Sequence, residues 1–136
     1  MANQKLLLVE DDLTLGELLL SVFDKTGHSV TWFVRARLQD GALTFMDADG
    51  VESVLPADGY ALALVDFRLK GSALDGPDVT TQLVKAGIPV VGISGLRQLN
   101  ELMVQAGARG GISKDELFSR VLRHELVVDH NFCGVK

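Results

Sequence analysis

The sequence predicts an α/β fold with a doubly wound, five-stranded parallel sheet in the strand order 2-1-3-4-5. Short apolar runs alternate along the chain with longer segments in which apolar residues recur at helical spacing. The run that ends at Asp66 is almost wholly apolar, as expected for a strand buried on both faces of a parallel sheet. Strands that alternate with helices at this spacing are typical of a parallel sheet with helical crossovers.

Local sequence signals place the individual elements. We expect strands at Lys5–Val9, Ser29–Val34, Ala61–Asp66, Ile88–Ile93 and Ala108–Ile112. We expect helices at Leu13–Lys25, Pro77–Lys85, Leu96–Ala106 and Lys114–Leu126. Thr14 and Glu17 have the spacing of a capping box for the first helix, with Asp12 as the alternative cap. Ser113 and Glu116 have the same spacing at the start of the last helix.

The segment between the second and third expected strands has two interpretations. Ala36 to Leu43 has the composition of a poor helix, interrupted by Gly41. Alternatively, residues 43–46 and 51–55 pair as a β-hairpin around Asp47-Ala48-Asp49-Gly50, a turn rich in aspartate that ends in glycine. The hairpin is favoured, so we expect an atypical segment, with a β-hairpin, at residues 36–58.

Composition excludes several classes of protein. A chain of 136 residues with 47% hydrophobic residues fits one globular domain, here 1–126, followed by a tail at 127–136. No apolar run has the length of a membrane span, and no secretory signal is recognisable, so we expect a cytoplasmic protein with no membrane partner. Cys133 has no second cysteine to pair with. A formal net charge of -5 argues against direct nucleic-acid binding.

Polar residues follow the expected strands at their carboxyl ends, which is where open α/β sheets bind ligands. Glu10 and Asp11 follow the first strand, Asp66 ends the third, and Ser94 and Lys114 follow the fourth and fifth. Three carboxylates brought together require a cation, and oxygen ligands favour Mg²⁺. Asp66, isolated on the central strand, is the best candidate nucleophile for an aspartyl phosphate. Ser94 and Lys114 would then contact phosphoryl oxygens.

These residues lie in segments that resemble the receiver domain of two-component response regulators, which has the flavodoxin-like (CheY-like) fold. The resemblance spans nearly the whole chain, from about Lys5 to Leu126. The matching segments are Leu8-Val9-Glu10-Asp11-Asp12, Leu64-Val65-Asp66-Phe67-Arg68-Leu69, Asp75-Gly76, Pro89–Gly95 and Ala106–Lys114.

The resemblance implies a role for each matched residue. Asp66 matches the phosphoacceptor, and Glu10 and Asp11 match the acidic pair that binds Mg²⁺, together with the backbone carbonyl of Arg68. Ser94 matches the switch hydroxyl and Lys114 the phosphate-binding lysine. The implied protein is a phosphorelay component rather than an enzyme, since it catalyses only its own phosphoryl transfer and autodephosphorylation.

The resemblance also implies partners. A histidine kinase or a histidine phosphotransfer protein would donate the phosphoryl group, and a downstream protein or effector domain would read the result. A homodimer is one of the assemblies that the sequence leaves open.

Some positions depart from the family pattern. Gly111 stands where many members carry the aromatic residue that moves on activation, and residues 36–58 are unlike the usual second helix. These departures motivate an alternative, an atypical receiver that serves as a phosphorylation-independent interaction module. A metal-dependent phosphatase with Asp66 as nucleophile is disfavoured, because Arg68 occupies the place where such enzymes often need a second carboxylate.

Overall fold

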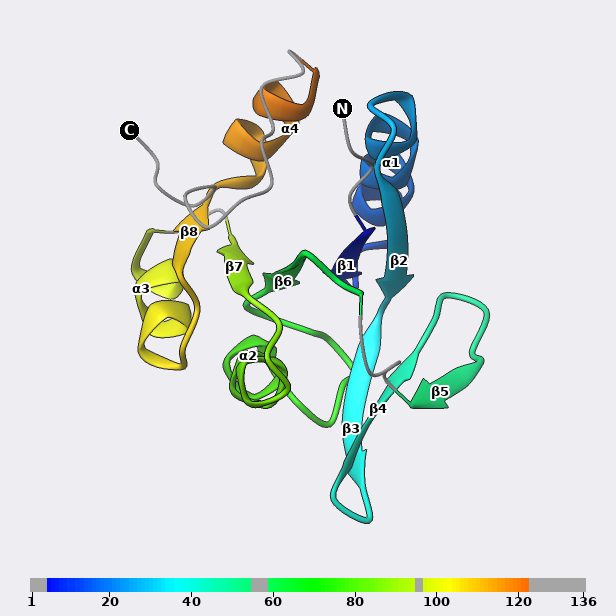
Figure 1. Cartoon of the computed structure of the whole chain (residues 1–136), viewed down its shortest axis with the longest axis vertical. Coiled ribbons are helices and arrows are strands. Elements are labelled where there is room, and N and C mark those ends of the chain that lie inside the picture. The colour runs from blue at the N-terminus through cyan, green and yellow to red at the C-terminus, as the bar shows by residue number, and fades with distance from the viewer. Residues whose placement is uncertain (1–4, 55–58, 95–96, 123–136) are drawn as a thin grey trace.

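A five-stranded parallel sheet forms the centre of the molecule and runs in the order β2-β1-β6-β7-β8 (Figure 1). The computed structural model describes residues 5–54, 59–94 and 97–122. The sheet comprises β1 (Lys5–Val9), β2 (Ser29–Phe33), β6 (Leu62–Asp66), β7 (Val90–Ile93) and β8 (Gly110–Ile112). The helices are α1 (Leu13–Lys25), α2 (Gly76–Lys85), α3 (Arg97–Gln105) and α4 (Lys114–Leu122). The predicted fold class and strand order are confirmed, with the third to fifth expected strands as β6 to β8.

The helices cover both faces of this sheet, and each face has its own apolar core. Alternate residues of β1 point to opposite faces, since side chains on a strand have a period of two. Leu6 and Leu8 pack with α1 and α4, whereas Leu7 and Val9 pack with α2 and α3. All residues of β6 are buried. The apolar run that ends at Asp66 therefore marks the centre of the fold.

The helix caps settle the question that the sequence left open. Asp12 caps α1, because its carboxylate accepts a hydrogen bond of 3.1 Å from the backbone N–H of Leu15. At the start of α4, Ser113 Oγ accepts one of 3.1 Å from the N–H of Glu116, as its capping-box spacing predicts. The cap of α1 matters for the site, since Asp12 follows the acidic pair directly.

The segment after β2 forms a second, antiparallel sheet, which we call the inserted sheet. It comprises β3 (Arg35–Gln39), β4 (Ala42–Met46) and β5 (Glu52–Val54) in the order β3-β4-β5. The expected hairpin of residues 43–46 and 51–55 corresponds to β4 and β5, with residue 55 outside the described residues. The helical alternative for residues 36–43 is wrong, because most of them belong to β3 and to its turn into β4.

Two turns shape the inserted sheet. Asp40 and Gly41 connect β3 to β4 with φ values of 52° and 80°, as a tight hairpin turn with two left-handed residues requires. Between β4 and β5, Asp47 Oδ1 accepts hydrogen bonds from the N–H groups of Asp49 and Val51. The aspartates of this second turn therefore shape the backbone.

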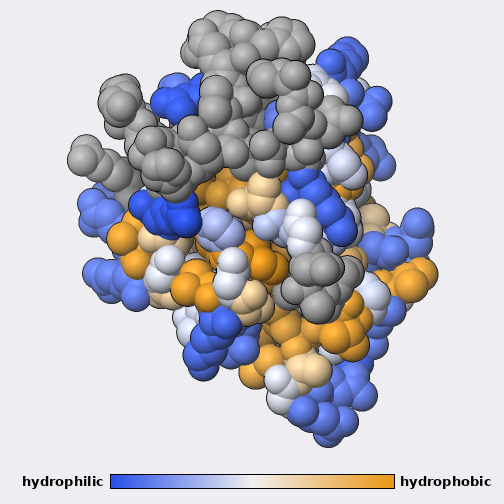
Figure 2. Space-filling view, in the orientation of Figure 1, coloured by the Kyte–Doolittle hydropathy of each residue, from blue (hydrophilic) through white to orange (hydrophobic). Residues whose placement is uncertain are grey.

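The inserted sheet exposes several apolar side chains. Leu38, Val51 and Val54 are all exposed. In Figure 2, apolar and hydrophilic residues lie side by side in the lower part of the molecule, where Figure 1 places this sheet. In the described part of the chain, no helix has the length and apolarity needed to cross a membrane. The predicted tail, 127–136, and the end of the last predicted helix lie outside the described residues.

Candidate functional site

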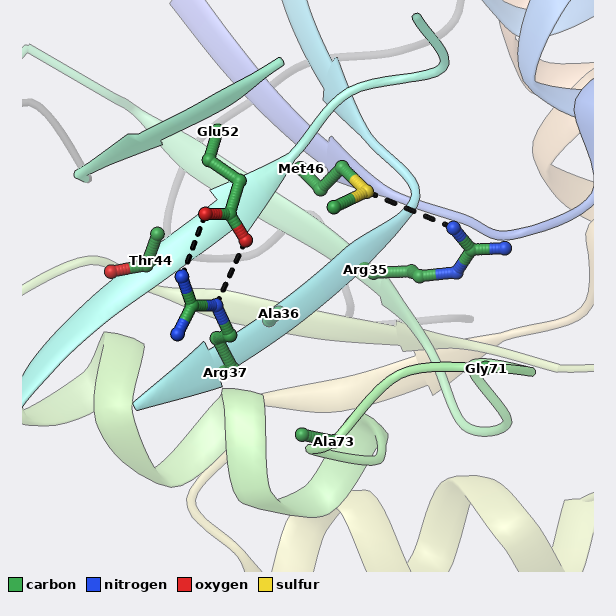
Figure 3. Close-up of a pocket in the computed structure, with 8 residues that line it drawn as sticks. All are labelled: Arg35, Ala36, Arg37, Thr44, Met46, Glu52, Gly71 and Ala73. Carbon is green, nitrogen blue, oxygen red and sulfur yellow. Dashed lines mark hydrogen bonds and ion pairs between the residues drawn. The ribbon is translucent and has the colours of Figure 1, made fainter. Parts of the chain in front are cut away.

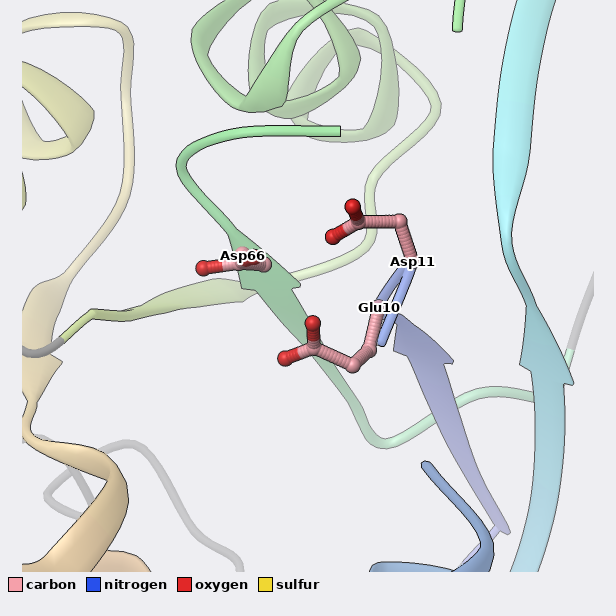
Figure 4. A group of neighbouring side chains, drawn as sticks. All are labelled: Glu10, Asp11 and Asp66. Atoms are coloured by element: carbon pink, nitrogen blue, oxygen red, sulfur yellow. The ribbon is translucent and has the colours of Figure 1, made fainter. Parts of the chain in front are cut away.

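Three carboxylates meet at the carboxyl end of the parallel sheet. Glu10 and Asp11 follow β1, and Asp66 is the last residue of the neighbouring strand β6. One oxygen atom from each carboxylate lies within 4.8 Å of those of the other two. Figure 4 shows the three side chains at adjacent strand ends, extending to the same side. The predicted convergence of these residues is therefore present in the structure.

Glu10 is the most deeply buried member of the group. Its side chain has no exposed surface, and one of its oxygens, Oε2, accepts a hydrogen bond of 3.1 Å from the N–H of Asp12. The other, Oε1, lies 3.3 Å from Lys114 Nζ, which is ion-pair distance when Glu10 is ionised, but the contact is not a well-aligned hydrogen bond. Burial and the charge of Asp66 raise the pKa of Glu10 from 4.5 to about 8. A buried carboxylate in this position favours a proton or a cation.

Asp66 is also buried, at 7% exposure. Burial raises its pKa from 3.8 to about 6, Lys114 opposes the rise, and the charge of Asp11 adds to it. Asp66 is therefore mostly ionised at neutral pH. A carboxylate that is ionised and poorly solvated is a better nucleophile than one in water, because less hydration has to be removed before it reacts.

Lys114 supplies the positive charge of the site. Its Nζ lies 3.6 Å from Asp66 Oδ1, in addition to its contact with Glu10. Burial alone would lower the pKa of Lys114, but the two carboxylates together raise it. The lysine therefore remains charged and compensates for part of the negative charge. The geometry leaves an excess of carboxylate oxygens, which are the donors that Mg²⁺ prefers.

Ser94 and Arg68 lie at the same edge of the sheet. Ser94 is buried and directly follows Ile93, which is the register partner of Asp66. Arg68 lies in the loop after β6, and its side chain is exposed. The structure thus brings four of the predicted residues into one cluster, Glu10, Asp11, Asp66 and Lys114, and places Ser94 next to it on the adjacent strand.

The loop after Asp66 contributes contacts that we did not predict from the sequence. The N–H of Lys70 donates a hydrogen bond of 3.1 Å to Asp11 Oδ2. Two residues further on, Ser72 Oγ accepts a hydrogen bond of 2.9 Å from the N–H of Ala36 at the start of the inserted sheet. Hydrogen bonds between residues so far apart in the chain leave no periodic signal in the sequence.

Trp32 makes a further contact with the site that we did not predict from the sequence. Its indole Nε1 donates a hydrogen bond of 2.8 Å to the backbone carbonyl of Glu10. Its ring lies across Gly16 of α1, where a Cβ atom would overlap the indole carbons. We expected Trp32 to be a core and helix-packing residue, which is confirmed by its contact with the core cluster. The polar contact with Glu10 is additional.

Gly111 has a neighbour that fills the space above it. Gly92 and Gly111 are register partners on β7 and β8, and the side chain of Asn100 from α3 lies against both. A Cβ atom at Gly111 would overlap Asn100, and one at Gly92 would come within 3.1 Å of its Oδ1. This oxygen is buried and has no hydrogen-bond partner in the described part of the chain. An aromatic residue at position 111 would therefore have to displace Asn100.

Comparison with known proteins supports the interpretation of the fold. No family model and no curated protein matches the sequence. Among solved structures, the chain resembles the receiver domain of the sensor histidine kinase PA1611 from Pseudomonas aeruginosa, a structure with a magnesium ion coordinated in its active-site cleft. The TM-score is 0.61 at 19% identity, covering 98% of this chain and 100% of that one.

Two further receiver domains are similar to the same extent. That of NtrX from Brucella abortus gives a TM-score of 0.60 at 23% identity, covering 87% of this chain and 98% of that one. That of the Francisella response regulator 1452 gives 0.57 at 19% identity, covering 88% and 93%. The chain spans only 28% of a longer NtrX structure that it also matches. The protein therefore has the fold of response-regulator receiver domains.

Proposed function

We propose that this chain is the phosphoacceptor receiver of a two-component system and that Asp66 accepts the phosphoryl group. The observation that carries the proposal is the cluster of three carboxylates and one lysine at the carboxyl end of the parallel sheet. Chemically, such a cluster can hold a divalent cation next to a nucleophile and a compensating positive charge.

The proposed reaction is a direct phosphoryl transfer. An oxygen of Asp66 attacks the phosphorus atom of a phosphohistidine on a partner protein and forms an acyl phosphate. The P–N bond breaks, and its electron pair returns to the imidazole of the donor, which takes up a proton. Lys114 faces a phosphoryl oxygen and compensates for its charge, and the hydroxyl of Ser94 donates a hydrogen bond to another. Water later attacks the phosphorus atom of the acyl phosphate, the P–O bond to Asp66 breaks, and inorganic phosphate leaves as the Asp66 carboxylate is restored.

The donor set fits Mg²⁺. Glu10, Asp11 and Asp66 would hold the ion, with the backbone carbonyl of Arg68 as a further ligand. When bound, Mg²⁺ would neutralise the charge of the incoming phosphoryl group. Without a cation, Glu10 is protonated at neutral pH, since its pKa is raised to about 8. Binding of Mg²⁺ at this site would therefore compete with protonation of Glu10.

The proposed setting follows from this chemistry. A histidine kinase or a histidine phosphotransfer protein in the cytoplasm supplies the phosphoryl group, and a downstream protein or effector domain reads the modified state. Apart from its own phosphorylation and autodephosphorylation, the chain has no catalytic role in this proposal.

Incubation with a small acyl phosphate and Mg²⁺, followed by mass spectrometry of the intact protein, tests this proposal. We expect a single acid-stable, base-labile phosphoryl group that requires Mg²⁺ and is absent from Asp66→Asn. Asp24→Asn, an exposed position on α1, is the matched control and should be modified as the wild type is. Equal modification of wild type and Asp66→Asn would refute the assignment.

A phosphorylation-independent interaction module is the second candidate. The contact of Asn100 with Gly92 and Gly111 favours it, because no aromatic ring is available at position 111 to respond to the state of Asp66. The inserted sheet would then be the distinguishing surface. This candidate fails if phosphorylation changes partner binding and Asp66→Asn abolishes the change.

A further inference from the structure

Residues 32–36 comprise the end of β2, Val34 and the start of β3, and they contact both halves of the candidate site. We call this stretch the junction. At its first end it holds the backbone of Glu10 from two directions. Trp32 Nε1 donates to the carbonyl of Glu10 at 2.8 Å, and the N–H of Glu10 donates to the carbonyl of Phe33 at 3.0 Å. The backbone that presents the acidic pair is therefore held by the junction as well as by the parallel sheet.

At its other end the junction holds the loop that follows Asp66. The N–H of Ala36 donates to Ser72 Oγ at 2.9 Å, and the N–H of Leu74 donates to the carbonyl of Ala36 at 3.1 Å. Ser72 Oγ also lies 2.9 Å from the carbonyl oxygen of Ala36 and 2.7 Å from that of Leu74, so its hydroxyl can donate a hydrogen bond to either one. Ser72 is thus a crosslink between the loop and the inserted sheet.

A side-chain contact reinforces this crosslink. The guanidinium of Arg35 lies over Gly71, where a Cβ atom would come within 2.9 Å of Nε. Arg35, Gly71 and Ala73 line a cavity of about 140 Å³. The ion pair of Arg37 and Glu52 on the inserted sheet lines the same cavity (Figure 3). Position 71 has a φ of 74°, which glycine adopts without strain.

These contacts form a closed ring of residues that includes Glu10 and Asp11 of the candidate site. The junction binds the backbone of Glu10, which is followed in the chain by Asp11. The carboxylate of Asp11 accepts the 3.1 Å hydrogen bond from the N–H of Lys70 in the loop after β6. Ser72 of the same loop bonds back to the junction. The ring joins the strand that carries Glu10 and Asp11 to the loop that follows Asp66. A shift of either one changes the separation of the carboxylates.

We propose that the junction positions the metal site, with Trp32 and Ser72 as the two positioning residues. This inference rests on the proposed function, because it concerns the Mg²⁺ site of the same receiver. Neither residue touches the ion. Each acts through the backbone that presents its ligands, as the outer contacts of metal sites do when they fix ligand orientation. The inserted sheet begins in the junction and therefore helps to position the residues of the metal site.

Mg²⁺ titration of the whole chain by calorimetry tests this proposal with Trp32→Phe and Ser72→Ala. Trp32→Phe keeps an aromatic ring at position 32 and removes the N–H donor. Ser72→Ala removes the hydroxyl that bonds to the backbone of Ala36. Thr81→Val is the control, since it removes a hydroxyl that bonds to the carbonyls of Pro77 and Ala106, away from the site. Thermal unfolding of each variant accompanies the titrations.

We expect Trp32→Phe and Ser72→Ala each to bind Mg²⁺ roughly three- to tenfold more weakly, while Thr81→Val binds as the wild type does. The Mg²⁺ concentration that gives half-maximal phosphorylation should rise by the same factor. The rate at saturating Mg²⁺ should stay within about twofold of wild type, because positioning affects ion binding and leaves the nucleophile in place.

Wild-type Mg²⁺ affinity in both variants would overturn the inference and leave the proposed function standing. Absence of Mg²⁺ binding in the wild type would overturn both. If Trp32→Phe does not fold, Ser72→Ala alone decides the outcome, since its hydroxyl lies in a loop and its removal creates no large cavity.

Discussion

Replacement of Glu10 by glutamine should change how the stability of the cation-free protein depends on pH. Glu10 has a pKa of about 8 in the folded chain and about 4.5 when unfolded. Below pH 4.5 it is protonated in both states, so its contribution to stability is fully present there. As pH rises towards 8, ionisation favours the unfolded chain. Each pKa unit corresponds to about 1.4 kcal/mol, so the wild type loses about 3 kcal/mol from this group between pH 4.5 and pH 7.

Urea unfolding in a chelator at several pH values measures this effect. We expect the wild type to lose about 3 kcal/mol more than Glu10→Gln between pH 4.5 and pH 7. Glu17→Gln, on the exposed face of α1, should follow the wild type. Mg²⁺ should restore the stability of the wild type at pH 7 by binding to the folded state. Equal losses in wild type and Glu10→Gln would show that Glu10 ionises freely, and the account of the buried cluster would then be wrong.

Three further predictions concern the site and its surroundings. Mg²⁺ binding at pH 7 should release about one proton, because Glu10 is then protonated, and almost none at pH 9; calorimetry in buffers of different ionisation enthalpy measures the number. Gly16→Ala should lower the free energy of unfolding by about 1–3 kcal/mol in urea, since the new methyl group displaces the ring of Trp32, whereas Ser21→Ala on the same helix should have little effect. Gly111→Tyr should lower the free energy of unfolding by a similar amount, and adding Asn100→Ala should recover part of this loss. Strictly additive effects of the two substitutions would contradict this prediction.

The sequence predicted the parallel sheet and the candidate site because both depend on local pattern. An apolar run such as the one that ends in Asp66 is stable where helices cover both faces of the sheet, in the interior of a parallel sheet. Strand ends then fix the neighbours of Asp66, because parallel strands deliver Glu10, Asp11 and Lys114 to the same edge. The chemistry of the site follows from residue type once this edge is known.

Contacts that depend on exact distances between layers could not be predicted. Gly16 looks like an ordinary small residue in a helix, and only the structure shows the ring of Trp32 lying across it. Ser72 lies in a loop without periodicity, and its partner is 36 residues away. The strand β3 was missed as a separate strand because its Arg35-Ala36-Arg37 start has no strong β pattern, although Asp40-Gly41 is a good hairpin signal.

The outer strand of the inserted sheet has a consequence for how the protein behaves in concentrated solution. Among the described strands, β5 pairs only with β4, so its other side presents backbone groups to a further strand. Its one charged residue, Glu52, forms a two-pronged ion pair with Arg37, at 2.6 and 2.8 Å. The charge that would repel an incoming strand is thereby neutralised within the molecule. Self-association of the protein would begin along this edge of β5, and the short length of the strand limits such association.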